Sequence, residues 1–223
     1  MEESSKQARE QGVRNKNPLQ SAKALQKKNS IRETAFHVFA KKGFKDVTMK
    51  DIAEACGISR GGLYLYYEST EELFLDLLQY SSEKTGDEFE KTIAGMNDAG
   101  EILRLFLIAQ KKELFEKDKA LTKASYEYAF AYAGDRDERH PGMTELRKTF
   151  EDAVRVIEFL IRMGKRQHRF FCEDNHAAAV NIMLVVEGLK ICSETIGLEE
   201  NQVDREIDFI LESLTRRSYK ERA

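Results

Sequence analysis

A helix start, a three-residue turn and a second helix start follow one another closely in this chain, and they constrain its fold more than any other feature. The run Thr48–Asp51 matches a capping box, and Gly57 ends the helix that begins there. Ser59 can begin another helix at once, because its side chain can cap free backbone amides. Ile58 lies between the two helices and is expected to pin both to a third. This order and spacing predict a helix-turn-helix over residues 48–66.

The rest of the chain also has the composition and periodicity of helices. It contains only two prolines, Pro18 and Pro141, and many leucine, alanine, glutamate and lysine residues. Apolar residues recur at spacings of three and four, as in Ile31, Ala35 and Val38. The expected helices are residues 21–42, 49–56, 60–66, a longer helix from 70, and 98–117, 119–133, 141–167, 174–196 and 201–218. No convincing strand is found, so the predicted fold class is all-α.

Several helix ends can be assigned from capping residues. Gly43 supplies the left-handed residue that ends the first helix. Ser69 and Glu72 form a second capping box, in which the Glu72 carboxylate is expected to accept a hydrogen bond from the Ser69 amide. Asn201 is expected to cap the last helix.

Three regions are expected along the chain. Residues 1–20 have no hydrophobic periodicity, and Gly12 and Pro18 would interrupt a helix, so this segment is predicted to be a mobile tail. Residues 21–67 are predicted to form a three-helix domain that contains the helix-turn-helix. Residues 68–223 are predicted to form a larger helical domain.

The charges are unevenly distributed along the chain, whose formal net charge is −3. Residues 1–70 carry 13 lysines and arginines against 8 aspartates and glutamates, whereas residues 71–223 carry 23 against 31. A basic N-terminal part on an acidic body is typical of a protein whose N-terminal part meets a polyanion. A chance excess of basic residues in the tail would give the same balance, so charge alone does not identify the partner.

The composition argues against a membrane, secreted or metal-dependent protein. No uninterrupted apolar run reaches the roughly 18 residues that span a bilayer, and the N-terminal MEESSKQARE lacks the apolar stretch of a secretory signal. The three cysteines form no close pair, which fits a reducing compartment. The four histidines show no metal-site spacing with cysteines or carboxylates. We therefore expect a cytoplasmic protein with no membrane segment, no metal and no cofactor.

The helix-turn-helix and its flanking segments resemble the TetR family of bacterial regulators. The resemblance runs through Phe36–Phe44 and Val47–Ser59 and ends with Gly62–Tyr67 and Glu71–Phe74. The remaining two thirds of the chain share only helicity and length with that family. The resemblance implies about nine helices, of which the first three bind DNA and the last two pair with a second copy. It also implies a pocket for a small ligand that changes DNA affinity, and most members are repressors.

The second helix of the motif is expected to enter the DNA. Gly61 and Gly62 leave its N-terminal end bare, so that the backbone can approach the duplex. Arg60 precedes them and can form a bidentate contact with guanine. Leu63 and Tyr67, four residues apart, are expected to face the core instead.

The other candidates for DNA contact offer hydroxyl groups, ammonium groups or free amides to phosphates. They are Lys27, Lys28, Thr48, Lys50, Ser59, Tyr64, Tyr66 and Thr70. At the position of Thr70 the family usually places a lysine, and Glu68 lies nearby. This departure places that phosphate contact in doubt, although Thr70 still offers a hydroxyl and an amide.

The larger domain carries candidates for a ligand pocket and for a dimer interface. Aromatic, methionine and carboxylate side chains would line a pocket for a bulky, largely apolar molecule, neutral or cationic; they are Tyr126, Phe130, Phe159, Met163, Met183 and Glu187. Ordinary core packing is the alternative explanation for these side chains. Helices 174–196 and 201–218 are too apolar to be left exposed, and the candidates for contact with a second copy are Ala179, Leu184, Ile191, Ile207 and Leu211. A two-fold dimer predicts a palindromic operator in double-stranded DNA.

The leading hypothesis is therefore a dimeric repressor that a small ligand releases from DNA. A DNA-binding regulator with no small-molecule response is the first alternative, and it would need a filled core. An activator is another, because the sign of regulation depends on the position of the operator. An enzyme would need a nucleophile–base pair or a set of metal ligands, and the sequence contains no such constellation.

Overall fold

The computed structural model describes residues 22–116, 120–134 and 140–216, and every regular element within these ranges is a helix. The helices are α2 (Ala22–Lys42), α3 (Met49–Ala55), α4 (Arg60–Tyr64), α5 (Thr70–Ile93), α6 (Ala99–Phe115), α7 (Thr122–Tyr132), α8 (Pro141–Arg166), α9 (Asn175–Thr195) and α10 (Glu200–Thr215). The predicted all-α fold is confirmed, and the tail predicted over residues 1–20 lies outside the described residues.

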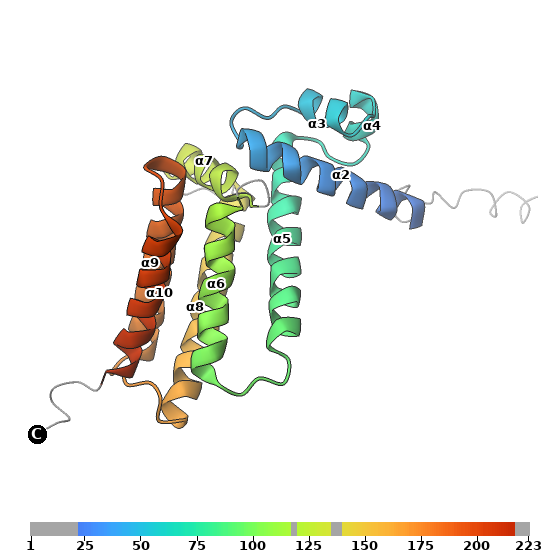
Figure 1. Ribbon diagram of the computed structural model, residues 1–223. Coiled ribbons are helices and arrows are strands. Elements are labelled where there is room, and N and C mark those ends of the chain that lie inside the picture. The colour runs from blue at the N-terminus through green and yellow to red at the C-terminus, as the bar shows by residue number, and fades with distance from the viewer. Residues whose placement is uncertain (1–21, 117–119, 135–139, 217–223) are drawn as a thin grey trace, which may run out of the picture.

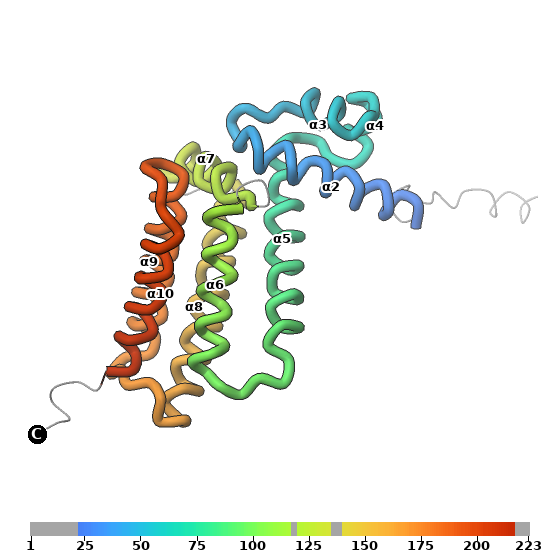
Figure 2. The backbone as a smooth tube through the Cα atoms, in the orientation of Figure 1, coloured from blue at the N-terminus to red at the C-terminus, as the bar shows by residue number. Residues whose placement is uncertain are grey.

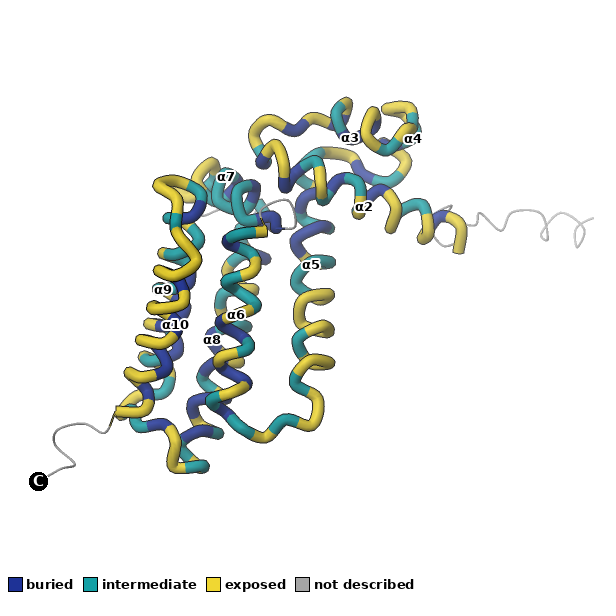
Figure 3. The backbone as a smooth tube through the Cα atoms, in the orientation of Figure 1, coloured by how far each residue is buried: buried dark blue, intermediate teal, exposed yellow. Residues whose placement is uncertain are grey.

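The helices form a small N-terminal unit and a bundle of long helices (Figures 1 and 2). We call residues 22–67, with α2, α3 and α4, the head, and residues 70–216 the body. Helix α5 runs from the head along the body, α7 lies at the head end of the bundle, and α9 and α10 form the edge farthest from α5 (Figure 1). This arrangement leaves α4 on the outer surface of the head and the outer faces of α9 and α10 exposed (Figure 3).

The hydrophobic core of the head includes residues from the body. Ile31, Ala35 and Phe39 lie on the inner face of α2, as the sequence predicts. They belong to one buried cluster with side chains of α3, α4, the first half of α5 and α7, among them Phe74 and Tyr128. The boundary at residue 67 therefore stays a prediction, because the packed core continues across it.

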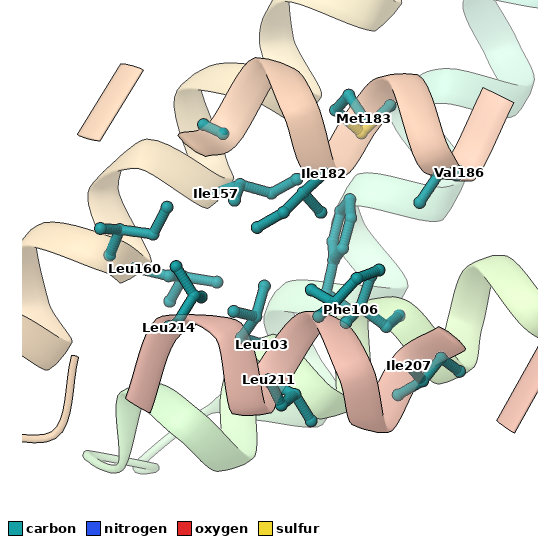
Figure 4. Close-up of a cluster of buried hydrophobic side chains, with 14 of the residues drawn as sticks. Leu103, Phe106, Ile157, Leu160, Ile182, Met183, Val186, Ile207, Leu211 and Leu214 are labelled. Atoms are coloured by element: carbon teal, nitrogen blue, oxygen red, sulfur yellow. The ribbon is translucent and has the colours of Figure 1, made fainter. Parts of the chain in front are cut away.

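A second buried cluster fills the body (Figure 4). Its side chains point toward one another from α6, α8, α9 and α10; those labelled are Leu103, Phe106, Ile157, Leu160, Ile182, Met183, Val186, Ile207, Leu211 and Leu214. The four helices are each apolar on the face that meets this cluster, so burial of these side chains holds the bundle together.

Two helix starts differ from the sequence expectation. Ser69 caps α5 by accepting a hydrogen bond from the Glu72 amide at 3.0 Å, but the Glu72 carboxylate accepts from the Glu68 amide and not from Ser69. The last helix begins at Glu200, where Glu199 and Gln202 form the capping box, so Asn201 lies inside the first turn. In the first case the carboxylate binds the amide of the residue before Ser69, and in the second the cap lies two residues before the predicted one.

Two glycines inside helices test how tightly the body is packed. Gly164 is buried in α8, and a Cβ there would overlap the buried ring of Phe170. Gly86 is exposed in α5, and a Cβ there would meet no atom within 4 Å. Alanine is the better helix former by about 1 kcal/mol, but overpacking a core costs about 1–3 kcal/mol. Gly86→Ala should therefore stabilise the protein and Gly164→Ala should destabilise it.

Urea denaturation followed by circular dichroism measures both free energies of unfolding. Equal stabilisation by the two alanines would show that the ring of Phe170 does not pack on α8.

Candidate nucleic-acid interface

The turn between α3 and α4 is built as the sequence predicts. Gly57 has a φ of +63°, in the left-handed region that favours glycine. The Ile58 amide donates to the Ala53 carbonyl at 3.0 Å, and the Ile58 side chain packs against the buried cluster of the head. Ser59 caps α4 by accepting a hydrogen bond from the Gly62 amide at 3.0 Å. The turn thus holds α4 in a defined orientation on the head.

Helix α4 has one buried face and one exposed face. Leu63 and Tyr67 are both buried, which confirms the predicted inner face. On the outer face Gly61 is exposed, and a Cβ built on it would meet no atom within 4 Å. Tyr64 is 47% exposed and closes the helix, which is two residues shorter than the predicted span ending at Tyr66. The outer face is therefore narrow and accessible.

The side chains around α4 divide into exposed and packed groups. Arg60 is exposed and makes no ion pair within the part of the chain that the structure describes. Lys50 is also exposed, with its Nζ 3.7 Å from Glu54 Oε1. Tyr66 is half-buried and packs against the cluster of the head. Arg60 and Lys50 are accordingly placed for an outside partner, whereas much of Tyr66 is used in packing.

Thr48 caps α3 together with Asp51. Its hydroxyl oxygen accepts from the Asp51 amide at 3.2 Å, and the Asp51 carboxylate accepts from the Thr48 amide at 2.9 Å. Lys42 Nζ also lies 2.6 Å from Asp51 Oδ1. Hydrogen bonds from Lys42 and Thr48 hold the pKa of Asp51 well below its ordinary value. The phosphate contact predicted for Thr48 would have to compete with this capping box.

The flanking candidates are partly engaged in the head itself. Lys28 Nζ lies 3.2 Å from Asp76 Oδ1, an internal ion pair that the sequence does not predict. Lys27 is half-buried on the neighbouring position of α2. Thr70 is half-buried in the first turn of α5, beyond the exposed Glu68. These positions surround the head but are less accessible than Arg60 and Lys50.

A cluster around Asp76, which the sequence analysis missed, joins α2 to α5. Asp76 Oδ2 accepts from Arg32 Nε and from the Tyr67 hydroxyl, both at 2.5 Å, and Oδ1 accepts from Arg32 Nη2 at 3.0 Å. Burial alone would raise the pKa of Asp76, but hydrogen bonds from Arg32, Tyr67 and Lys28 outweigh it and hold the pKa below its ordinary value. The available signal was Tyr67, because the hydroxyl of an inward-facing tyrosine needs a partner.

Helix α7 makes two polar contacts that were also missed, one with the head and one with the first turn of α5. Glu127 Oε2 accepts from the Lys45 amide at 3.0 Å and lies over Gly43, whose φ is +87° and where a side chain would overlap the carboxylate. The Tyr128 hydroxyl donates to Glu71 Oε1 at 2.6 Å. Burial and the Glu71 carboxylate raise the pKa of Tyr128, so the hydroxyl keeps its proton. The body is thereby connected to the head beside Gly43 and Lys45.

Part of the predicted ligand site is a polar cluster between α6, α7 and α9. The Tyr126 hydroxyl donates to Glu187 Oε2 at 2.5 Å, and Phe130 stacks against the Tyr126 ring with centroids 6.3 Å apart. Lys190 Nζ lies 3.4 Å from Glu187 and 3.6 Å from Glu113. Phe130 is exposed on the outside of this cluster. The structure thus brings Tyr126, Phe130 and Glu187 together.

The other three ligand candidates lie elsewhere. Phe159 is exposed on α8, Met163 is partly buried, and Met183 lies inside the core of the body. A cavity between α6, α9 and α10, in the same core, has a volume of about 10 Å³, roughly that of one water. Three of the six candidates thus lie together and three lie apart from them, and the ligand pocket stays a prediction.

The predicted dimer residues fall on two different faces. Ala179, Ile207 and Leu211 are buried in the core of their own chain and leave little surface for a second copy, so their place in an interface stays a prediction. Leu184 and Ile191, seven residues apart on α9, are 58% and 39% exposed. Periodicity identified α9 and α10 as apolar, but it did not show which face of each helix packs in the chain's own bundle.

Helix α9 is more apolar than its burial explains. By length and composition it could cross a membrane, with a mean hydropathy of 1.3, yet only 28% of that window is buried. One such helix is weak evidence for a membrane span, and the inner face of α9 is packed in the core of the body. Its exposed apolar side chains are instead what a helix needs to pack against another protein surface.

Comparison with known sequences places the head in a described family. Residues 31–77 match the sequence model described as "Bacterial regulatory proteins, tetR family". A curated relative from Bacillus subtilis, the uncharacterized HTH-type transcriptional regulator YfiR, is 53% identical over 49 residues, which are 22% of this chain and 24% of that protein. The probable acrEF/envCD operon repressor of Escherichia coli K12 is 36% identical over 56 residues, 25% of this chain and 26% of that protein. In the first three curated relatives the matched segment spans 24%, 21% and 19% of their length.

Comparison with solved structures extends the likeness to the body. A TetR transcription regulator from Haloarcula marismortui superposes with a TM-score of 0.75 at 17% identity, covering 86% of this chain and 99% of that one. A putative transcriptional regulator from Saccharomonospora viridis, solved in complex with choline, gives 0.74 at 19% identity, covering 85% and 98%. At such identities the likeness shows the fold. Residues 31–77 are thus similar in sequence to the TetR family of bacterial regulatory proteins, and the described helices share the fold of a solved TetR transcription regulator.

Proposed function

We propose that this chain is a cytoplasmic transcription regulator that binds a palindromic operator as a homodimer and represses transcription. The observation that carries the DNA-binding part is the exposed face of α4, within the segment that matches the family. Gly61 opens that face, although its own chain does not require a glycine there, because a Cβ would meet no atom within 4 Å. A residue without a side chain at this point lets the backbone approach phosphates and base edges.

Two exposed cations beside this face suit the two kinds of DNA contact. Arg60 can donate two hydrogen bonds to O6 and N7 of guanine in the major groove. Lys50 lies in the first turn of α3 and suits a phosphate, where its contribution would depend on salt. Ser59, which caps α4, would act by holding the start of the helix rather than by reading bases.

Gly61→Ala separates DNA binding from folding. Alanine favours a helix over glycine by about 1 kcal/mol, so the variant should be at least as stable as the wild type. Operator binding should nevertheless weaken at least about tenfold, or about 1.4 kcal/mol, because the methyl group holds the backbone away from the duplex. The operator would be selected from random double-stranded DNA, and Kd measured by fluorescence anisotropy at one salt concentration.

Gly86→Ala adds the same methyl group to an exposed position of α5 and serves as the matched control. It should leave Kd unchanged. Equal Kd values for the wild type and both variants would contradict a close approach of α4 to DNA.

The homodimer is proposed from the outer faces of α9 and α10. Leu184 and Ile191 on α9 and Phe209 on α10 are large apolar side chains left exposed by the folded chain. The two helices form one edge of the body, so these side chains can face a second copy across a two-fold axis (Figure 1). Such a dimer would hold two copies of α4 for two half-sites of a palindrome.

Release of the operator by a small ligand is the finer part of the proposal. The Saccharomonospora viridis relative was solved with choline. In this chain the rings of Tyr126 and Phe130 beside Glu187 are groups that attract a quaternary ammonium ion. The Lys190 ammonium group forms ion pairs with Glu187 and Glu113, so a cationic ligand would have to displace it.

The packed core favours a second candidate, a DNA-binding regulator that responds to no small molecule. Ligand pockets usually have about 300–1,000 Å³, whereas the core cavity between α6, α9 and α10 has about 10 Å³. A small molecule larger than water would therefore have to enlarge this cavity or bind elsewhere.

Choline chloride titrated into the operator complex, with sodium chloride at equal ionic strength as the control, is the first test. Compounds that raise the Tm of the protein in a thermal-shift screen would be titrated in the same way. Release by any of them supports the ligand-responsive repressor, and binding without release supports the second candidate. A reporter gene behind the selected operator distinguishes a repressor, whose removal raises expression, from an activator.

A further inference from the structure

Leu65 is a large apolar side chain left in water at the end of α4. Its side chain is 70% exposed, whereas Leu63, two residues earlier in α4, is fully buried. Leaving a leucine in contact with water is unfavourable, because its apolar surface gains by removal from water. An exposed leucine on the surface that the proposed function turns toward DNA is therefore available for an apolar contact with the duplex.

The backbone holds Leu65 on the same face as the other outward residues of α4. Its φ of −70° and ψ of −16° continue the helical conformation by one residue. Gly61, Tyr64 and Leu65 are then related by spacings of three and four, which place them on one face. The opposite face is anchored by buried Leu63 and Tyr67, and the Tyr67 amide donates to the Leu63 carbonyl at 3.2 Å. The orientation of Leu65 is thus set by packing on the other side of the turn.

Because the Leu65 side chain is apolar, it can form a favourable contact with only one kind of group in the major groove. A leucine side chain has no donor or acceptor, so it cannot bind the polar edges of guanine, cytosine or adenine. The C5-methyl group of thymine is the apolar group that the major groove presents. We propose that Leu65 packs on a thymine methyl group in each operator half-site and thereby discriminates thymine from the other bases. This inference rests on the proposed function.

The spacing along α4 places this thymine relative to the contact of Arg60. Five residues separate Arg60 from Leu65, which is about 7.5 Å at the helical rise of about 1.5 Å per residue. Successive base pairs are about 3.4 Å apart. When α4 lies along the groove, the thymine lies about two base pairs from the base that Arg60 contacts. The outer face of α4 then offers Arg60 at its start for hydrogen bonds with a base and Leu65 at its end for an apolar contact.

The test replaces single thymines of the selected operator with deoxyuridine, which removes the methyl group and leaves base pairing intact. Each substitution is made symmetrically in both half-sites, and Kd is measured for the wild type and for Leu65→Ala. At one position the wild type should lose about fourfold in affinity per half-site, hence about 16-fold for the symmetric operator. Leu65→Ala should bind the thymine operator more weakly by a similar factor and lose nothing further on the deoxyuridine operator.

Tyr64→Phe is the matched control, because it alters the adjacent exposed side chain and should keep the wild-type sensitivity to deoxyuridine. Because the Leu65 side chain is mostly in solvent, the Tm of Leu65→Ala should equal that of the wild type.

Three results would overturn the proposal: a wild type that binds the operator but tolerates every deoxyuridine, a Leu65→Ala variant that keeps the full sensitivity, or a variant with unchanged Kd. The last would assign Leu65 to a protein partner. If the wild type selects no DNA at all, the proposed function itself fails, which is a distinct outcome.

Discussion

Replacing Asp76 with alanine is expected to destabilise the protein by about 2–4 kcal/mol. The side chain of Asp76 is 18% exposed and accepts hydrogen bonds from Arg32, Tyr67 and Lys28. Removing one partner of a buried ion pair typically costs about 3–5 kcal/mol, because the other charge stays buried without compensation. The residual exposure of this cluster lowers the expected loss. Urea denaturation measures it.

Substitutions at two partners of Asp76 test whether the expected loss of stability comes from the buried part of the cluster. Lys28→Ala removes the most exposed partner and should cost no more than about 1 kcal/mol. Tyr67→Phe removes one hydroxyl and should cost about 1 kcal/mol, the usual contribution of a hydrogen bond. A loss for Asp76→Ala no larger than that for Lys28→Ala would show that the cluster is solvated and does not hold α2 to α5.

The same cluster makes stability depend on pH in a defined direction. The pKa of Asp76 is lower in the folded protein than in the unfolded chain, where it is about 3.9. Its contribution is therefore fully present above that unfolded value and is lost as the pH falls through the folded value. Stability should fall on acidification below about pH 4, and the fall should be shallower in Asp76→Asn. It should not vanish, because the pKa of Asp51 is lowered too.

Leu184→Glu combined with Ile191→Glu is expected to convert the proposed dimer into folded monomers and to weaken operator binding by about 100-fold or more. Both side chains are already exposed in the single chain, so the substitutions should not unfold it. In a two-fold interface each patch faces its own copy, so new carboxylates meet carboxylates across the axis. Losing the second half-site removes an avidity of about 10²–10⁴.

Sedimentation or light scattering gives the oligomeric state, and anisotropy with the selected operator gives Kd. Phe159→Glu places the same charge on an exposed aromatic of α8, outside α9 and α10, and should keep both the dimer and operator binding. A monomeric wild type, or a double variant that remains dimeric, would contradict the assignment of α9 to the interface.

The local rules of helix starts and turns were sufficient for the head. The capping box at Thr48, the left-handed Gly57 and the cap at Ser59 each depend on residues within four positions, and the structure has all three. The inward pair Leu63 and Tyr67 followed from the helical period alone. These features were predictable because their causes are hydrogen bonds and sterics between neighbours in sequence.

Features that depend on distant residues could not be obtained in this way. Periodicity identified α9 and α10 but did not show that Ala179 and Ile207 are buried in their own chain, because an apolar stripe does not say whether it meets its own bundle or a second copy. Asp76 and its partner Arg32 are 44 residues apart, and both read as ordinary surface charges until α2 and α5 are packed together. Burial and charge pairing are properties of the assembled chain, and they exist only once long-range packing has removed these groups from water.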